Sequence, residues 1–163
     1  MIKILTMLKI TTAIALGAAT AAFADVSVPV PSPEHKRLEL FVGNWQIDGE
    51  LAGKPLHVKQ ACEWFDGSFA VICKAGESGH RNLSIVTYNP HRQAYGYWTI
   101  NSTGLADTQI GTIDGNVWSF LSDGGATRAT VTPLETGGFA LVLELKNKDG
   151  KWEILEKSTY TAQ

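Results

Sequence analysis

Histidine is the first residue type to consider for metal or haem binding, and the chain has four histidines: His35, His57, His80 and His91. None belongs to an H-x-x-x-H pair or lies near a cysteine cluster, so their spacing does not indicate a zinc site. We expect His35, in a predicted helix, and His91, in a predicted turn, to be solvated. We expect His57 and His80 at the surface or at a rim. The sequence thus predicts no cofactor, with a haem held inside a barrel by His57 or His80 as the alternative.

A possible nucleophile lies in the segment Gly76–His80, where a serine stands between two glycines. The glycines do not have the G-x-S-x-G spacing, and no helix is predicted after them, so we expect a loop. A glycine-rich phosphate loop and a Rossmann fingerprint are also absent from the sequence. No catalytic residue is therefore predicted. An enzyme would need acid–base groups that converge inside the fold, and the candidates for that role are Asp107, Glu144, Glu156 and His80.

The aromatic residues are more informative, because the chain has five tryptophans and four tyrosines. Trp98, Trp118 and Phe120 lie in predicted strands in the middle of the chain, with Tyr88 near them. Rings that combine an apolar body with a polar tip suit a pocket for a small amphipathic molecule. Arg128 lies among small residues; it anchors a carboxylate or phosphate if it points inward, and it is a surface residue if it points outward. These five residues are the predicted ligand-binding set.

Two cysteines, Cys62 and Cys73, face each other in a predicted hairpin. If Gly67-Ser68 is a two-residue turn, residues whose numbers add up to 135 lie opposite each other, and the two cysteines meet this condition. In an oxidising compartment such a pair forms a disulfide. Two buried thiols in one core are the alternative. Because no C-x-x-C motif is present, a thioredoxin-like role is excluded.

Residues 1–24 have the pattern of a cleaved signal peptide. Lys3 and Lys9 give a weakly basic start, residues 10–22 are apolar and small, and Ala22-Phe23-Ala24 is an A-x-A cleavage pattern. The apolar run is too short and too rich in alanine for a membrane span. We therefore expect secretion, and no membrane span after cleavage.

The charge of the mature chain argues against two classes of partner. The whole chain has a net charge of −2, and the loss of Lys3 and Lys9 leaves 12 basic residues against 16 acidic ones, a net charge of −4. No basic stripe remains, so nucleic acid is not an expected partner. No polybasic segment remains to hold the protein on an anionic membrane. The length that remains fits a single domain.

After an N-terminal arm at residues 25–31, the chain is predicted to form a short helix and then a long antiparallel meander. Ser32-Pro33-Glu34 is a typical helix start, and Gly43 is a typical stop. From Trp45 onward apolar and polar residues alternate with a period of two, interrupted by turns such as Asn89–Arg92. This pattern predicts about ten strands of about eight residues each.

Such a meander must either pack as two sheets or close on itself, and closure removes its exposed edges. We predict an all-β fold over residues 32–163: an antiparallel up-and-down β-barrel of about 8–10 strands, plugged at one end by the helix. The last strand is expected to place Trp152, Ile154 and Tyr160 on one face. An outer-membrane barrel needs an apolar outward band. Here the faces opposite the predicted core are polar, with Gln46, Asp48, Glu50, His57, Lys59 and Glu63.

Gly43-Asn44-Trp45, after a short helix, resembles the G-x-W opening of the lipocalins and the wider calycin barrels. More of the chain is similar to a family of mostly bacterial proteins catalogued as domain of unknown function 1579, and the matching segments are Ser32–Lys36, Glu63–Phe69, Tyr88–Pro90, Gly111–Gly115 and Lys151–Glu153. The resemblance covers Ser32 to Thr161 and implies a lipocalin-like barrel, without an established activity. Lipocalins often stack a late arginine on the G-x-W tryptophan. The last strand here offers only Lys157, and Arg128 is the alternative for that role.

These features predict a secreted, lipocalin-like protein of a bacterial periplasm that binds or carries a small hydrophobic or amphipathic ligand in its barrel. One alternative is an enzyme on the same barrel, an isomerase or a hydrolase of a hydrophobic substrate. Another is a packed barrel that acts through its surface in the cell envelope. Charges that face the lumen would favour the enzyme, and a completely filled interior would favour the interaction protein. The sequence does not predict the oligomeric state.

Overall fold

The alternating pattern of the sequence forms ten antiparallel strands that follow one another along the chain. The computed structural model describes residues 29–77 and 80–163. The strands are β1 (Gly43–Leu51), β2 (Lys54–Trp64), β3 (Ala70–Glu77), β4 (His80–Asn89), β5 (Ala94–Asn101), β6 (Ala106–Asp114), β7 (Val117–Ser122), β8 (Thr127–Pro133), β9 (Phe139–Lys146) and β10 (Trp152–Ala162). An α-helix, α1 (Pro33–Lys36), and a 3-10 helix, η1 (Arg37–Phe41), precede β1, and a second 3-10 helix, η2 (Asp66–Ser68), joins β2 to β3. The predicted signal peptide, at residues 1–24, lies outside the described residues.

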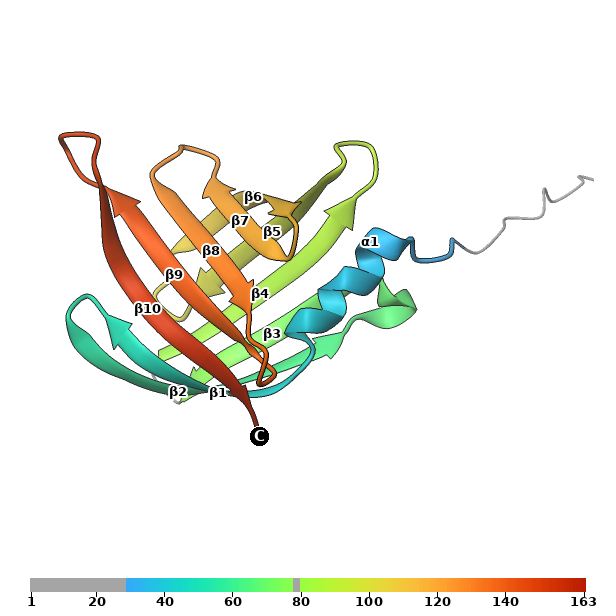
Figure 1. Cartoon of the computed structure of the whole chain (residues 1–163), viewed down its shortest axis with the longest axis horizontal. Helices are drawn as coiled ribbons and strands as arrows, with labels where there is room; N and C mark the ends of the chain where they lie inside the picture. The colour runs from blue at the N-terminus through green and yellow to red at the C-terminus, as the bar shows by residue number, and fades with distance from the viewer. Residues whose placement is uncertain (1–28, 78–79) are drawn as a thin grey trace, which may run out of the picture.

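The sheet closes into a barrel because β1 pairs with β2 on one side and with β10 on the other. All other neighbours are consecutive strands, so the barrel has simple up-and-down order (Figure 1). The seam between the first and last strands runs from Trp45, opposite Ala162, to Leu51, opposite Glu156. Closure removes the free sheet edges that would otherwise pair with other chains. The predicted all-β up-and-down barrel is confirmed, with ten strands.

The helical segment α1–η1 covers one end of the barrel, which we call the closed end. Leu38 is completely buried there, and the ring of Phe41 makes edge contacts with Trp118 and Phe139 at centroid distances of 5.0 and 5.6 Å. Such ring pairs add to the stability that burial of their apolar surface supplies. Only the first turn of the predicted helix is α-helical, since the segment continues as the 3-10 helix η1. In residues 29–77 and 80–163 no helix is long and apolar enough to cross a membrane.

His35 caps the first turn of α1. Its Nδ1 accepts a hydrogen bond from the backbone N–H of Ser32 at 3.1 Å, and it lies 2.9 Å from the Ser32 hydroxyl oxygen. Ser32 is thus the N-cap, as predicted, and His35 takes the place that glutamate or glutamine has in the usual capping box. The His35 ring packs edge-on against Phe69 and Tyr88. The expectation that His35 is solvated is therefore wrong, because only 5% of this residue is exposed.

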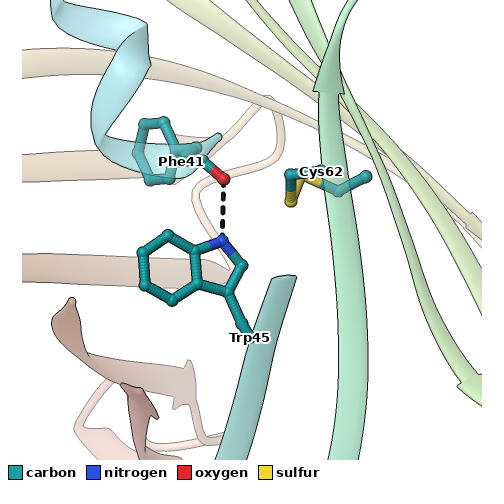
Figure 2. Close-up of a disulfide and its surroundings, with 4 residues drawn as sticks. Phe41, Trp45 and Cys62 are labelled. Carbon is teal, nitrogen blue, oxygen red and sulfur yellow. Dashed lines mark hydrogen bonds between the residues drawn. A yellow bond between two sulfur atoms is a disulfide. The ribbon is translucent and has the colours of Figure 1, made fainter. Parts of the chain in front are cut away.

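Trp45 connects the helical segment to the barrel. Its indole N–H donates a hydrogen bond of 2.9 Å to the carbonyl oxygen of Phe41 (Figure 2). Its ring packs against that of Phe139. Gly43 lies between them with a φ of +141°, a conformation that residues with a side chain rarely adopt. The glycine and the tryptophan of Gly43-Asn44-Trp45 therefore act together where the chain turns into β1.

We expect Trp45→Phe to lower the free energy of unfolding by about 2 kcal/mol, because it removes a hydrogen-bond donor and ring volume from the closed end. The control is Trp98→Phe, since Trp98 is 43% exposed. We expect that variant to change the free energy by less than about 0.5 kcal/mol. Urea unfolding followed by far-UV circular dichroism measures both values. Equal losses in the two variants would show that the bond to Phe41 does not stabilise the fold.

The hairpin of β2 and β3 carries a disulfide. Cys62 lies directly opposite Cys73, so the predicted register is confirmed, and the two sulfur atoms are bonded at 2.05 Å. The connection between the strands is longer than the predicted two-residue turn. It passes through η2, where Gly67 has a φ of +82°, and the Phe65 N–H closes the hairpin with a 2.8 Å hydrogen bond to the carbonyl oxygen of Ala70. Of the two alternatives for the cysteines, the structure has the bonded one.

Candidate ligand-binding site

The barrel encloses a cavity of about 460 Å³. Every one of the ten strands contributes lining residues, and Phe41 of η1 lines it from the closed end. The volume lies within the range of about 300–1,000 Å³ that is typical of small-molecule sites. The cavity extends toward the opposite end, which we call the open end, where β1 connects to β2 and β9 to β10. The alternative of a packed barrel requires a completely filled interior, and the interior here is not completely filled.

One side of the cavity is apolar. It is formed by β9, β1 and β2, which are grouped on one side of the barrel, where β10 lies between β9 and β1. Alternate residues of a strand point to the same face, so each strand presents a row of apolar side chains to the interior. These side chains are Ile47, Leu51, Leu56, Val58, Leu141 and Leu143. Their surface is the part of the site that favours a hydrophobic ligand, because burial of apolar area contributes about 25 cal/mol per Å².

The facing side of the cavity is polar and comes from β4, β5, β6 and β8. Its polar side chains are Asn82, Ser84, Thr99, Asp107, Gln109 and Thr127, and the same strands also contribute Val86, Tyr97, Ala129 and Val131 to the lining. Oδ2 of Asp107 accepts hydrogen bonds from the Gln109 amide at 2.9 Å and from the Thr127 hydroxyl at 3.4 Å. Oδ1 of Asn82 accepts one from the Thr99 hydroxyl at 2.5 Å. These bonds hold the polar groups in place, so the cavity is amphipathic, with an apolar side and an ordered polar side.

A β-bulge in β10 puts Ile154 and Glu156 on opposite faces of the barrel. The pairing of β10 with β9 shifts by one residue between Ile154 and Glu156, which leaves Leu155 as the extra residue. Because a bulge displaces the in–out alternation of a strand by one position, Ile154 is 64% exposed on the outside, whereas Glu156 and Tyr160 line the cavity. The prediction that Trp152, Ile154 and Tyr160 share one face is therefore wrong, since a strict period of two does not include the bulge.

The surroundings of Glu156 favour its neutral form. Its Oε1 accepts a 2.6 Å hydrogen bond from the Ser158 hydroxyl, but burial raises the pKa of the Glu156 carboxyl group. Burial also raises the pKa of the Tyr97 and Tyr160 phenols, and the nearby Glu156 carboxylate raises each pKa further. Both phenols line the cavity and stay protonated at neutral pH. They are therefore available as hydrogen-bond donors to a ligand.

The raised pKa of Glu156 predicts that its contribution to stability is lost as the pH rises. The folded state binds this proton more tightly than the unfolded state, so the contribution is fully present below the ordinary pKa of 4.5 and disappears as the pH rises through the folded-state pKa. Glu156→Gln is neutral at every pH. We therefore expect its melting temperature, relative to wild type, to be higher at about pH 8 than at about pH 4.

Differential scanning calorimetry at several pH values measures this difference. The control is Glu50→Gln, which removes an exposed carboxylate from β1. We expect the difference between this control and wild type to change little over the same pH range. A Glu156→Gln difference that stays constant from about pH 4 to about pH 8 would contradict the assignment of Glu156 as a buried, proton-retaining carboxyl group.

Three of the five predicted ligand-binding residues point into the barrel, and one of them, Phe120, lines the cavity. Its ring lies over Gly111, where a Cβ atom would come within 2.4 Å of the ring, so the glycine makes room for the phenyl group. Trp118 is buried deeper in the closed end, with its ring 4.6 Å from that of Tyr95. Tyr88 packs against the ring of Tyr95 at 5.1 Å. Trp118 and Tyr88 therefore form the floor under the cavity rather than its lining.

Arg128 lies on the outside of the barrel, so it does not anchor a ligand headgroup in the cavity. Its neighbours Thr127 and Ala129 line the cavity, and strand alternation places Arg128 on the other face. Its Nε and Nη2 atoms each lie 2.7 Å from Oε2 of Glu144, and its guanidinium carbon is 4.6 Å from the centre of the Trp152 ring. The arginine thus stacks on the outer Trp152 and not on the tryptophan of the G-x-W motif.

Trp98 also lies on the outer surface, contrary to the predicted lining role. Its neighbours Tyr97 and Thr99 line the cavity, and its own ring covers Gly96 on the opposite face of β5. The prediction grouped the mid-chain aromatics together without fixing which alternate residues of each strand point inward. The aromatic lining residues that this grouping missed are Phe41, Tyr97, Phe139 and Tyr160.

The acid–base candidates are divided between the two faces of the barrel. Asp107 and Glu156 line the cavity. Glu144 is on the outside, bound to Arg128. The side chain of His80 lies outside the described part of the chain. Among the side chains that the structure describes, these two carboxyl groups therefore reach the lumen, and charges that face the lumen are the feature expected of the enzyme alternative.

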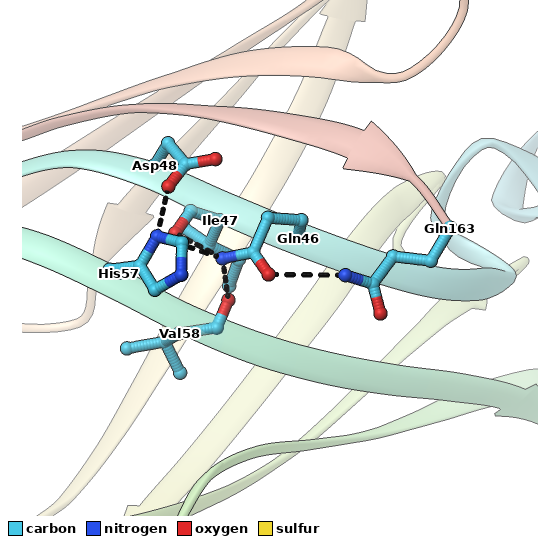
Figure 3. A network of polar contacts seen from close by, with 6 residues as sticks. All are labelled: Gln46, Ile47, Asp48, His57, Val58 and Gln163. Atoms are coloured by element: carbon cyan, nitrogen blue, oxygen red, sulfur yellow. Dashed lines mark hydrogen bonds and ion pairs between the residues drawn. The ribbon is translucent and has the colours of Figure 1, made fainter.

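His57 does not point into the barrel. Its side chain is 77% exposed, and its Nδ1 lies 2.5 Å from the carboxylate of Asp48 on the outer surface (Figure 3). Gln46 joins the same network, which extends to Gln163 through a 3.1 Å hydrogen bond. His57 is therefore not placed to bind a haem in the lumen. His91 is exposed, in agreement with the expectation that it is solvated. Among the residues that the structure describes, no three potential metal ligands come together.

Comparison with protein-family models gives no match for this chain, and comparison with curated proteins gives no significant similarity. The similarity to the lipocalin-like family thus stays a prediction. The fold and the site define the protein as a closed, ten-strand up-and-down β-barrel with an amphipathic internal cavity. This architecture is consistent with a lipocalin-like ligand-binding protein.

Proposed function

We propose that this protein is a secreted binding or carrier protein for one small hydrophobic or amphipathic molecule, held inside the barrel. The observation that carries the proposal is the cavity of about 460 Å³ with one apolar and one polar side. A site of this kind binds by burial of apolar ligand surface and fixes the orientation through a few polar groups.

The arrangement of the two sides suggests how a ligand would sit. Its apolar part would pack against the leucine-rich side formed by β9, β1 and β2. Its polar part would face Asp107 and Gln109, with the phenols of Tyr97 and Tyr160 as further donors. Because the cavity is formed by the barrel itself, little rearrangement is needed, and this lowers the entropic cost of binding.

Secretion into a bacterial periplasm is part of the same proposal. Residues 1–24 have the sequence pattern of a signal peptide. The Cys62–Cys73 disulfide is of a kind that persists in oxidising compartments and is rare in a reducing cytosol. A carrier in such a compartment would move molecules that are poorly soluble in water.

Native mass spectrometry of the protein purified from its own cells tests the proposal. We expect a small mass that stays bound under native conditions and is lost after denaturation, and this mass would identify the cargo. The sample after denaturation and refolding is the control, since it should rebind the extracted molecule. A protein without bound mass that also binds none of a panel of fatty acids, isoprenoids, amphipathic amines and haem would overturn the carrier function.

A second candidate function rests on the two carboxyl groups in the lumen. Glu156, whose pKa is raised by burial, has the properties of a general acid, and Asp107 has those of a base. This pair would suit an isomerase or a hydrolase of a hydrophobic substrate. Incubation of the extracted cargo with wild type and with Glu156→Gln separates the two functions. A carrier returns the cargo unchanged, whereas an enzyme converts it, and the variant converts it more slowly.

A further inference from the structure

We propose that the ligand carries a positively charged amine, and that the cavity selects against fatty acids and other carboxylates. This inference rests on the proposed function, because it names the class of molecule that the same cavity would bind. It starts from the charges of the lining residues: Asp107 and Glu156 are present, and no lysine, arginine or histidine is among the lining residues in the described part of the chain.

The two carboxyl groups approach the cavity from different sides of the barrel. Asp107 comes from β6, on the polar side, and Glu156 comes from β10, next to the apolar strands. Asp107 is held by the Gln109 amide and the Thr127 hydroxyl, and Glu156 by the Ser158 hydroxyl. These partners are all neutral. The negative charge inside the cavity is therefore not compensated by any described lining residue.

The basic residues next to the cavity strands are held on the outer face. Arg128 pairs with Glu144 on the outside, and Lys74 lies 4.0 Å from Glu63 there. Lys157 follows Glu156 directly and is exposed, because alternation points it away from the lumen. The fold thus places acids inside and nearby bases outside.

This distribution determines which headgroup is favoured. A carboxylate ligand would bring a further negative group close to Asp107 and to the Glu156 carboxyl group in a partly buried space, where like charges repel more strongly than in water. An ammonium group would instead pair with Asp107 or Glu156 and offset the cost of removing that carboxylate from water. Burial raises the pKa of the Tyr97 and Tyr160 phenols, and the nearby Glu156 carboxylate raises each pKa further, which agrees with a site that disfavours a second negative group. The affinity for an alcohol should fall between the affinity for the amine and that for the carboxylate.

Three probes that differ only in the headgroup test the inference: dodecylamine, dodecanol and dodecanoic acid. Each is titrated below its aggregation concentration at neutral pH, and its affinity is measured from displacement of the uncharged fluorescent probe N-phenyl-1-naphthylamine. We expect the amine to bind most tightly, with an affinity at least about tenfold higher than that of the carboxylate. A carboxylate that binds as tightly as the amine overturns the inference and leaves the proposed function intact. Failure of all three probes to bind overturns the proposed function and the inference together.

A double variant, Asp107→Asn with Glu156→Gln, shows whether the two lumen acids cause the preference. It keeps the shape of both side chains and removes their charge, so we expect the ratio of amine to carboxylate affinity to fall close to one. The matched control, Glu50→Gln with Asp114→Asn, removes the same charge from two exposed positions. It should keep the wild-type ratio. A ratio that falls equally in both double variants would attribute the preference to the overall charge of the protein and overturn the inference.

Discussion

Substitution of Ala75 by tryptophan is expected to abolish ligand binding while the barrel stays folded. Ala75 lines the cavity from β3 and lies opposite Gln60 of β2, so an indole ring at this position occupies the space that a ligand would fill. We expect the affinity for N-phenyl-1-naphthylamine to fall by about 100-fold or more, which corresponds to about 3 kcal/mol. Fluorescence titration of wild type and variant gives the ratio directly.

The neighbouring residue provides the control for this experiment. Lys74 is the preceding residue of β3, and its side chain points outward with 70% of its surface exposed. Lys74→Trp therefore introduces the same ring into the same strand on the opposite face. Far-UV circular dichroism checks that both variants are folded. If Ala75→Trp binds the probe as wild type does, or if Lys74→Trp loses binding equally, the cavity is not the binding site.

Removal of the disulfide is expected to have the largest effect on stability. The bond joins residues 11 positions apart, and in the chain-entropy model the closure of such a loop contributes about 3 kcal/mol. We expect the double variant Cys62→Ala with Cys73→Ala to lose about this much free energy of unfolding in urea titrations, with the barrel still folded in water. Both cysteines are buried in the core, so some loss of packing adds to the effect.

Reduction of the wild-type protein separates the contribution of the disulfide to stability from the contribution of cysteine packing. A reducing agent should lower the unfolding midpoint of wild type and leave that of the double variant unchanged, because the variant has no bond to reduce. A wild-type midpoint that is the same with and without the reductant would mean that the bond contributes nothing to the folded state. The reduced wild type should then be compared with the double variant, and the difference between them measures the lost packing.

The architecture could be predicted from the sequence because it depends on local and repeated signals. Alternation with a period of two, interrupted by turns, indicated an antiparallel meander, and closure followed from the need to protect its edges. The register of the cysteine hairpin, with Cys62 opposite Cys73, was also predictable from the position of the turn. Gly43 and Trp45 marked where the helical segment ends and the barrel begins.

The candidate site was less predictable because it depends on which alternate residues of each strand point inward. The sequence placed Trp98 and Arg128 in the right strands, but their neighbours are the ones that line the cavity. Burial of His35 depends on two rings far along the chain, Phe69 in the connection between β2 and β3 and Tyr88 in β4. The outward position of Ile154 depends on the single extra residue at Leu155, and no residue type in the sequence indicates that bulge. A residue-by-residue assignment of each strand, anchored on Phe120, would have found Tyr97 and Asp107.

The seam between β1 and β10 has a consequence for how the protein folds. It joins segments that are far apart in the chain; Gln46 and Gln163, which are hydrogen-bonded beside it, are 117 residues apart. Hairpins such as β2–β3 need only local contacts, whereas this last pairing brings a high loop-closure cost and is expected to be slow. During synthesis β1 therefore has an unpaired edge until β10 is available. The interior becomes sealed along its side only in that final step.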